Sequence, residues 1–353
     1  MKILDDPDLL KKRDPGGMLK TTYGLAEQIE DALSLLQKSP PLPSFSFQKM
    51  VFCGTGGGSR SAFDLIHSYL FSSLSLPFYP LQAYELPGFV DADTLAVLVS
   101  HSGNTEETVS ALENALYRTR NIVVVTGGGE MENMAHKHDL YMLKVPVGIE
   151  ARSAIGYLFF VLLHILGKLL PTLYPEEEIE EAICHLKRER ELIREDQPLK
   201  VNLAKQIASK LEKRFPMIYG FAGFSDGVAL RFQRQLAENA KMLAHSNLIP
   251  NMHHDEIVGY EEKGLEGKAI VVLIRDHFEE KKISKRFEVT KEVLEEKGFP
   301  VLEVYPQNKG SKLARMFSLV QLIDYASIYL ALLRGFNPRE VFIIKLLKQK
   351  MRE

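Results

Sequence analysis

Hydroxyl and amide side chains crowd the stretch SHSGNTEET, which follows the apolar run LAVLVS and precedes VSALENALYRTR. The apolar run predicts a buried strand, and the last segment predicts a helix. A helix N-terminus that follows a parallel strand offers unpaired N–H groups and a partial positive charge, which favour an anion. Four side chains add neutral hydrogen-bonding groups: Ser100, Ser102, Asn104 and Thr105. We interpret this turn as a phosphate site that needs neither a metal nor a Walker lysine. A plain helix cap is the alternative.

A glycine-rich turn, CGTGGGSR, follows another short apolar run. A dinucleotide fingerprint, GxGxxG, would need a glycine where Ser59 stands, and the chain contains no GxxxxGK[ST] phosphate loop. Glycines still allow a ligand to approach the backbone closely. We interpret the turn as the lining of a ligand site, with a ligand-free connection between strand and helix as the alternative.

The segment NMHHDEIVGYE concentrates titratable side chains. Adjacent side chains diverge along a chain and the pattern HExxH is absent, so we do not expect a metal site here. A histidine that titrates near neutrality suits acid–base chemistry. The alternative is a surface loop with two exposed histidines, His253 and His254.

Two charged residues lie beside apolar helical patterns. Glu238, in RFQRQLAENAKML, is either a solvated helix residue or a base with a raised pKa. Arg152, in GIEARSAIGYLFF, either caps backbone carbonyls or contacts a ligand anion. The patterns leave both pairs of alternatives open.

The composition bounds the class of protein. The chain has 353 residues, of which 45% are apolar and 25% charged, with a formal net charge of −2. These values are typical of a soluble globular protein of two domains, and they predict neither nucleic-acid nor membrane binding. Two distant cysteines, Cys53 and Cys184, and a charged N-terminus unlike a secretory signal favour a reducing cytoplasm. The apolar segment 154–170 is short for a membrane span, so we expect a buried helix.

Strand and helix patterns alternate in two regions of the chain. This alternation predicts an α/β protein of two doubly wound domains, each with a parallel sheet flanked by helices. We place an N-terminal domain with the phosphate loop at 1–172, a charged and largely solvated connecting helix at 173–196, and a C-terminal domain with the last helices at 197–353. The segment 318–335 is apolar nearly all round and should be buried.

An ordered set of motifs resembles the bifunctional phosphoglucose/phosphomannose isomerase family, a branch of the SIS (sugar isomerase) superfamily. The set runs through DPGGMLKTTYGLAEQIEDAL, the glycine turn, ELPGFVDADTLAVLVSHSGNTEET, ENAKML, HHDEIVGYE and YLALLRGFNP with a basic C-terminal helix. The resemblance implies two SIS domains and a homodimer with active sites near the subunit boundary. It also implies the interconversion of glucose 6-phosphate and fructose 6-phosphate through a cis-enediol(ate), without metal or cofactor. Mannose 6-phosphate stays open as a second aldose.

The resemblance further implies roles for single residues. Glu238 matches the base that moves the proton between C1 and C2, and Arg152 matches the arginine that stabilises the enediolate. His254 matches a histidine that assists ring opening and reaches in from the partner subunit. Lys348 best matches a C-terminal lysine that also opens the ring. Two other lysines keep that alignment open by a turn: Lys345 and Lys350.

The implied substrate contacts come from the two turns. The phosphate ligands are Ser100, Ser102 and Thr105, with Asn104 in the same turn. The sugar lies along the glycine turn, at Gly57, Gly58 and Ser59.

Four positions depart from the family's usual pattern. Gly58 stands where the family's GMGGSG has serine, and Ala151 stands where it has proline. Asp255 and Tyr260 replace the asparagine and tryptophan of HNEIVGW. A carboxylate beside His254 could raise the pKa of that histidine. The departures leave the main roles in place but say nothing of substrate preference.

Two other functions compete with the isomerase. A sugar-phosphate sensor would need the phosphate turn but not the set of Glu238, His254 and a C-terminal lysine, so that set favours an enzyme. An amino-sugar isomerase related to glucosamine-6-phosphate synthase is disfavoured, because the chain lacks an amidotransferase half. Ammonia dependence of turnover would identify it.

Overall fold

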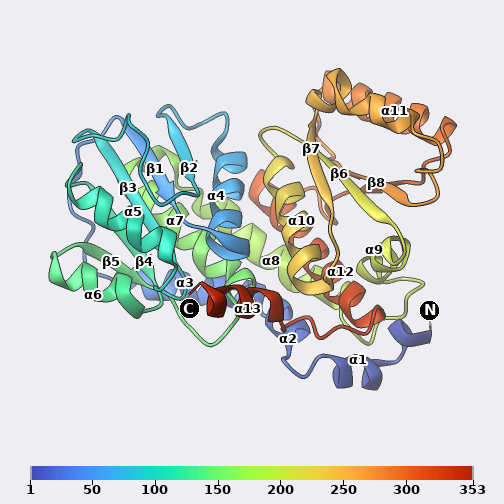
Figure 1. Cartoon of the computed structure of the whole chain (residues 1–353), viewed down its shortest axis with the longest axis horizontal. Helices are drawn as coiled ribbons and strands as arrows, with labels where there is room; N and C mark the ends of the chain where they lie inside the picture. The colour runs from blue at the N-terminus through green and yellow to red at the C-terminus, as the bar shows by residue number, and fades with distance from the viewer. Residues whose placement is uncertain (1, 352–353) are drawn as a thin grey trace.

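Two parallel sheets, each covered by helices, lie side by side in the structure, a computed structural model that describes residues 2–351 (Figure 1). The strand order is β2-β1-β3-β4-β5 in the first sheet and β7-β6-β8-β9 in the second. All neighbouring strands in both sheets are parallel. The predicted α/β architecture is therefore confirmed.

The first sheet contains three strands that the apolar runs predicted and two that they did not. The predicted strands are β1 (Lys49–Cys53), β3 (Thr94–Ser100) and β4 (Ile122–Thr126), and all but one of their residues are buried. The edge strands β2 (Phe78–Leu81) and β5 (Tyr141–Lys144) were missed. Each has four residues with mixed exposure, which gives little hydrophobic signal.

The second sheet contains three strands that the sequence predicted and one that it did not. The predicted strands are β6 (Phe215–Phe221), β8 (Ala269–Ile274) and β9 (Val301–Val304). The missed strand is the edge strand β7 (His245–Ile249), whose sequence HSNLI begins with three polar residues and is only half-buried. The other edge strand of this sheet, β9, was predicted, so the hydrophobic pattern was too weak at only one of the two edges.

Helices occupy most of the remaining chain. Those of the first half are η1 (Lys2–Asp5), α1 (Pro7–Arg13), α2 (Met18–Tyr23), α3 (Leu25–Gln37), α4 (Gly56–Leu70), α5 (Glu106–Leu116), α6 (Gly129–Lys137), η2 (Ala151–Ser153), α7 (Ile155–Leu169) and η3 (Pro171–Leu173). Those of the second half are α8 (Glu176–Ile193), α9 (Leu203–Leu211), α10 (Asp226–Ala240), η4 (Asn251–His254), η5 (Glu256–Glu261), α11 (Lys281–Glu296), α12 (Lys312–Leu333) and α13 (Phe342–Lys350).

The two most apolar helices are buried in the core, as predicted. α7 buries 11 of its 15 residues and packs against α3 and α4. Within residues 2–351, only α12 is long and apolar enough to cross a membrane by length and composition, and its whole apolar window is buried inside the protein. It contacts α8, α9 and α10, so it forms the central helix of the second half.

The expectation of a largely solvated connecting helix is wrong for α8. One stripe of the helix, with Ile179, Ala182 and Leu186, is buried, and the helix packs against α12 and α3. The prediction relied on the many charged residues of this helix, which lie on its other faces, and it overlooked the apolar residues of the buried face. Even Glu189 is buried, where desolvation raises the pKa of its carboxyl group. The domain boundaries themselves stay a prediction.

Two helices of equal length, α4 and α10, pack against each other where the two halves meet (Figure 1). Gly57, near the start of α4, lies against Glu238 near the end of α10. Conversely, Gly227 near the start of α10 lies against Asp64 and Ser68 of α4. The pair is therefore antiparallel, and it brings the glycine turn of one half to the end of a helix in the other.

Candidate active site

The turn after β3 is closed by its own hydroxyl groups. The Ser100 and Thr105 hydroxyl oxygens are 2.9 Å apart, and the Gly103 N–H donates to Ser100 Oγ over 3.1 Å. Gly103 has φ +70°, and a Cβ there would overlap the Gly128 carbonyl, so only glycine fits. Thr105 is the N-cap of α5 but makes no capping hydrogen bond with its side chain. This disfavours the plain helix cap.

The two exposed side chains of the turn, Ser102 and Asn104, differ in how many of their hydrogen-bonding groups the protein already uses. Ser102 is exposed, and its Oγ accepts only a long, 3.4 Å bond from the Asn104 N–H. Asn104 is also exposed, but its Oδ1 accepts from the Glu130 N–H at 3.0 Å and its Nδ2 donates to the Ser102 carbonyl at 3.2 Å. Asn104 thus connects the turn to the start of α6. Its role as a phosphate ligand stays a prediction.

The glycine turn lies directly against the end of β3. A Cβ at Gly54 would lie 2.6 Å from the Val99 carbonyl oxygen, so the backbones are in contact there. Val99 precedes Ser100, which begins the phosphate turn. The strand order, with β1 beside β3, thus brings the two predicted turns together.

The other end of the glycine turn meets the predicted base. A Cβ at Gly57 would overlap Glu238 Oε1 and would lie 3.0 Å from Arg152 Cβ. Arg152 Nη1 is 3.4 Å from Glu238 Oε2, and the two side chains are 3% and 22% exposed. Three predicted site residues from α4, η2 and α10 therefore converge at one point.

Arg152 takes the first of the two roles that its sequence left open, because it bonds to backbone carbonyls, and its contact with a ligand anion stays a prediction. Its Nη2 donates to the carbonyls of Pro338 (2.8 Å) and Arg339 (3.1 Å), and its Nε donates to Asn239 Oδ1 (2.6 Å). Burial lowers the pKa of its guanidinium, yet an arginine stays protonated. Because the protein holds Nε and Nη2, Nη1 is the nitrogen that faces Glu238.

A second buried arginine, Arg231 of α10, bonds to the backbone at the point where Gly57 and Arg152 meet. Sequence reasoning missed this residue. Arg231 is fully buried and forms an ion pair with Asp324. It donates to the Arg152 carbonyl at 2.9 Å and to the Gly57 carbonyl at 3.4 Å. The available signal was an arginine at helical spacing among apolar residues that are buried in α10: Val228, Phe232 and Leu236.

Two departures from the expected family pattern touch each other. A Cβ at Gly58 would lie 2.6 Å from the Ala151 carbonyl oxygen and 3.2 Å from Ala151 Cβ. Glycine at position 58 thus permits the close approach of the segment that carries Arg152. Ser59 is buried one residue later.

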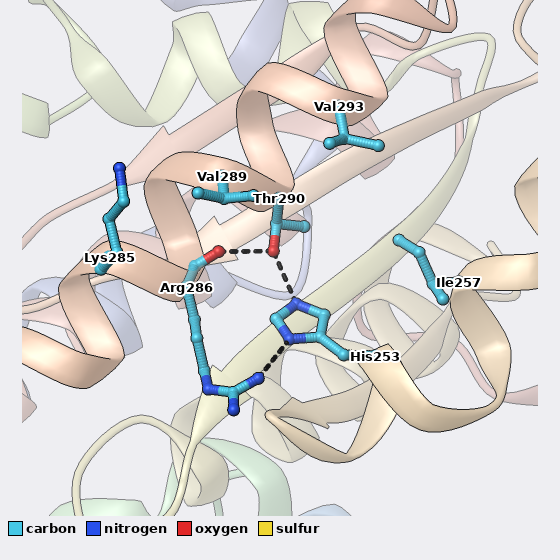
Figure 2. A pocket seen from close by; sticks show the side chains of 7 residues that line it. All are labelled: His253, Ile257, Lys285, Arg286, Val289, Thr290 and Val293. Carbon is cyan, nitrogen blue, oxygen red and sulfur yellow. Dashed lines mark hydrogen bonds between the residues drawn. The ribbon is translucent and has the colours of Figure 1, made fainter.

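The adjacent histidines, His253 and His254, have different environments, and Figure 2 shows that of His253. His253 points toward α11, where its Nε2 is 2.7 Å from Thr290 Oγ1 and its Nδ1 is 3.0 Å from Arg286 Nη1. Arginine only donates, so Nδ1 accepts and Nε2 carries the proton that His253 donates to Thr290. Burial lowers the pKa of this histidine, in keeping with a neutral ring. His253 is structural, whereas His254 is exposed.

A half-buried polar cluster fixes the segment that carries His254. Glu256 accepts hydrogen bonds from Tyr219 Oη (2.5 Å) and Asn247 Nδ2 (2.6 Å), and it pairs with His245 (3.0 Å). The Tyr260 hydroxyl lies 2.6 Å from that of Tyr219. Tyr219 donates its only hydroxyl proton to Glu256, so Tyr260 is the donor in its bond with Tyr219. The tyrosine at 260 therefore belongs to the anchor of the segment.

The remaining predicted residues lie on the surface. α13 has no buried residue, and Lys345 pairs with Glu340 at 3.4 Å. Within the described part of this chain, neither His254 nor Lys348 forms a hydrogen bond or ion pair with Glu238. Their catalytic roles stay predictions. No group of three His, Cys, Asp or Glu side chains in residues 2–351 is arranged to hold a metal ion.

The structure is that of an α/β protein with two parallel sheets flanked by helices. A hypothetical protein of Thermus thermophilus has the same fold: it matches 99% of this chain and 94% of its own, with a TM-score of 0.74 and 18% identity. Residues 200–351 match the family described as bacterial phospho-glucose isomerase C-terminal SIS domain.

Curated relatives define the family more closely. A bifunctional phosphoglucose/phosphomannose isomerase of Caldicellulosiruptor bescii is 34% identical over 338 residues, which cover 95% of this chain and 99% of that protein. Another, of Aquifex aeolicus, is 31% identical over 312 residues, 87% of this chain and 91% of that protein. The chain belongs to the bifunctional phosphoglucose/phosphomannose isomerase family.

Proposed function

We propose that this protein is an aldose–ketose isomerase that interconverts glucose 6-phosphate and mannose 6-phosphate with fructose 6-phosphate. The observation that carries the proposal is the contact of Glu238 with Gly57 and Arg152, next to the hydroxyl-rich turn. A base, a cation and an anion site are the three groups that proton transfer beside the carbonyl of a sugar phosphate needs. The family membership supports the same reaction.

The proton transfer follows from this arrangement. Ser100, Ser102 and Thr105 hold the phosphate at the N-terminus of α5, and the sugar extends along the glycine turn. Glu238 removes the proton from C2 of the open aldose, and the C–H electrons form the C1–C2 double bond of the enediolate. Arg152 Nη1 stabilises the negative charge on oxygen. Glu238 then returns the proton to C1, which yields the ketose once the proton on the O2 hydroxyl has moved to O1.

The same intermediate explains two aldose products. The enediolate carbon C2 is planar, so a proton delivered to either face gives glucose 6-phosphate or mannose 6-phosphate. The face that receives the proton selects the product, so the ratio of the initial rates at which the two aldoses form reports how the site holds the sugar.

Two surface residues, His254 and Lys348, are candidates for the opening of the sugar ring. The substrate is mostly a closed ring, so a further acid and base must open it before proton transfer. His254 and Lys348 are our candidates, and we propose that His254 acts in the site of a partner subunit. Its exposure and its rigid anchor through Glu256 suit a residue that projects into a neighbour.

We propose a homodimer on a second ground. α13 is a nine-residue helix without a buried residue, and five apolar side chains on it are more than 40% exposed: Phe342, Ile343, Ile344, Leu346 and Leu347. So short a helix is not stable without packing. A partner chain that covers α13 would supply that packing, and light scattering of the purified protein measures the resulting mass.

We also propose a cytoplasmic location. Cys53 is buried and Cys184 exposed, and both are free thiols. Free cysteines fit a reducing compartment. Cell fractionation with an antibody to the protein tests this placement.

The deciding experiment is turnover of fructose 6-phosphate by purified protein treated with EDTA. Glucose 6-phosphate and mannose 6-phosphate are followed separately, each with its own coupled assay. Formation of both supports the proposal, and formation of one restricts it to that aldose. Saturable binding of fructose 6-phosphate without turnover would replace the enzyme with a sugar-phosphate sensor.

A further inference from the structure

We propose that Lys241 is a positioning residue for this reaction, because its ammonium group ties the end of α10, beside Glu238, to the segment that leads into α13. The inference rests on the proposed function, since it concerns the placement of the proposed base. The resemblance assigned no role to this lysine.

The backbone of Lys241 first indicates that its side chain matters. Lys241 ends α10 with φ +53°, and its N–H donates to the Leu236 carbonyl. Glycine is the usual residue at a left-handed helix end, because a side chain is disfavoured there. A lysine at this position accepts backbone strain, and its side chain makes contacts that glycine lacks.

Those contacts use the whole ammonium group. Lys241 Nζ donates to the carbonyls of Glu238 (3.1 Å), Asn239 (3.0 Å) and Asn337 (2.8 Å). The first two belong to the last turn of α10, whose carbonyls have no partners within the helix. An ammonium group has three N–H donors, so all of them are used.

The third carbonyl connects the helix end to the C-terminal segment. Arg152 donates hydrogen bonds to the carbonyls of the next two residues of that segment, Pro338 and Arg339. It also donates to the Asn239 side chain at the end of α10. Lys241 and Arg152 therefore each connect the end of α10 to residues 337–339 by hydrogen bonds. Together they fix Glu238 relative to the segment that precedes α13.

The surroundings of Lys241 leave room for movement if its tie is lost. A cavity of about 520 Å³ lies between the end of α10 and the start of α13, and its lining includes Glu238, Lys241, Asn337 and Phe342. With open space on this side, no packed side chain would replace the missing hydrogen bonds. The end of α10 would shift relative to the glycine turn.

The charge state of Lys241 gives the inference a distinctive signature. Burial, and then the Arg152 guanidinium, lower the pKa of Lys241 to about 8, while the carboxylates of Glu340 and Glu238 oppose the shift. Below pH 8 the ammonium keeps all three donors. Above pH 8 the neutral amine has two, so one carbonyl loses its partner and kcat should fall.

Two variants at this position separate positioning from folding. Lys241→Met keeps the aliphatic stem and removes the donors, and we expect kcat for fructose 6-phosphate to fall about 10–100-fold with little change in KM. Lys241→Arg keeps donors and a permanent charge, so we expect substantial activity without the decline above pH 8.

Lys312→Met is the matched control. Lys312 is also a partly buried lysine with a pKa lowered by burial, and its Nζ donates to the Ser68 (3.0 Å) and Tyr69 (2.7 Å) carbonyls. It lies at the start of α12, and the proposed mechanism does not use it. We expect Lys312→Met to lower Tm and to leave kcat unchanged.

The outcomes distinguish the inference from the function on which it rests. An active wild type with an unchanged kcat in Lys241→Met overturns the inference alone, as does an alkaline decline that persists in Lys241→Arg. Equal losses of kcat in Lys241→Met and Lys312→Met also overturn it, since both lysines would then be merely structural. A wild type without turnover of fructose 6-phosphate overturns the proposed function, and this inference with it.

Discussion

The carboxyl ends of β3 and β8 occupy corresponding places in the two sheets, yet they carry opposite chemistry. β3 leads into a turn of neutral hydroxyl groups, of which Ser102 is exposed with one long hydrogen bond. β8 leads into Arg275 and Asp276, which are both buried. Arg275 pairs with Glu279 (2.7 Å) and Glu303 (2.6 Å), and Asp276 pairs with Arg315 (2.7 Å).

This difference shows that a place in the fold does not make an anion site. At the end of β8 the protein's own carboxylates take the arginine donors, so no donor remains for a phosphate. At the end of β3 the groups are neutral and in part free, and the helix N-terminus supplies the positive potential. On the proposed function, the first half binds the anion and the second half supplies the carboxylate through α10.

The largest expected effect comes from removing that carboxylate. Glu238→Gln keeps the size of the side chain but cannot accept a proton from carbon, so we expect kcat to fall by about 10³-fold or more. Exchange of the substrate C1 or C2 proton with solvent, followed by NMR, should stop while fructose 6-phosphate still binds. Full activity of the variant would remove Glu238 from the mechanism.

The antiparallel pair of α4 and α10 offers a sharper comparison at its two glycines. In Gly57→Ala the new methyl group meets Glu238 Oε1, the end of a flexible side chain, so we expect a folded protein with kcat lower by about 10²-fold. In Gly227→Ala the methyl group meets the Asp64 carbonyl at 2.7 Å, which is backbone, so we expect lost stability instead.

Kinetics and thermal unfolding of both glycine variants measure this contrast. A Gly57→Ala protein with wild-type kcat would show that Glu238 has space to move without harm. Equal losses of Tm in the two variants would show that both glycines serve only the helix contact.

The central strands, the buried helices and the two turns were predictable because each is a local pattern. A run such as LAVLVS is typical of a strand buried on both faces, and a turn such as SHSGNTEET holds more hydroxyl and amide groups than a helix cap needs. The edge strands β2, β5 and β7 were missed because β2 and β5 are short with mixed exposure and β7 begins with three polar residues. Such strands gain their structure from the neighbour with which they pair.

The connections between the turns were not predictable from spacing. Gly57 and Glu238 are 181 positions apart, and only the packing of α4 on α10 joins them. Lys241 escaped notice because its partners are backbone carbonyls, which every sequence contains. Arg231 escaped notice because its partners, the Asp324 carboxylate and the Arg152 carbonyl, are far away in the sequence. A charged side chain on a buried helical face is the signal that would have found Arg231.

A smaller effect should follow from stripping the phosphate turn of two hydroxyl groups. In a Ser102→Ala and Thr105→Ala double variant, two neutral donors to the phosphate are lost while the α5 N-terminus remains, so we expect KM to rise about 30-fold with a smaller change in kcat. Steady-state kinetics and direct binding of fructose 6-phosphate measure this. An unchanged KM would contradict the assignment of this turn to the phosphate.

The least effect on catalysis is expected at the opposite edge. Arg275 is 4% exposed, and Arg275→Met would leave Glu279 buried without its partner, so we expect the free energy of unfolding to fall by about 3–5 kcal/mol. The KM for fructose 6-phosphate should stay at the wild-type value, because these charges satisfy each other and bind no substrate. Denaturant unfolding and kinetics on the same preparation measure both quantities. A rise in KM without loss of stability would mean that the end of β8 also binds the anion, and the division of work between the two halves would then be wrong.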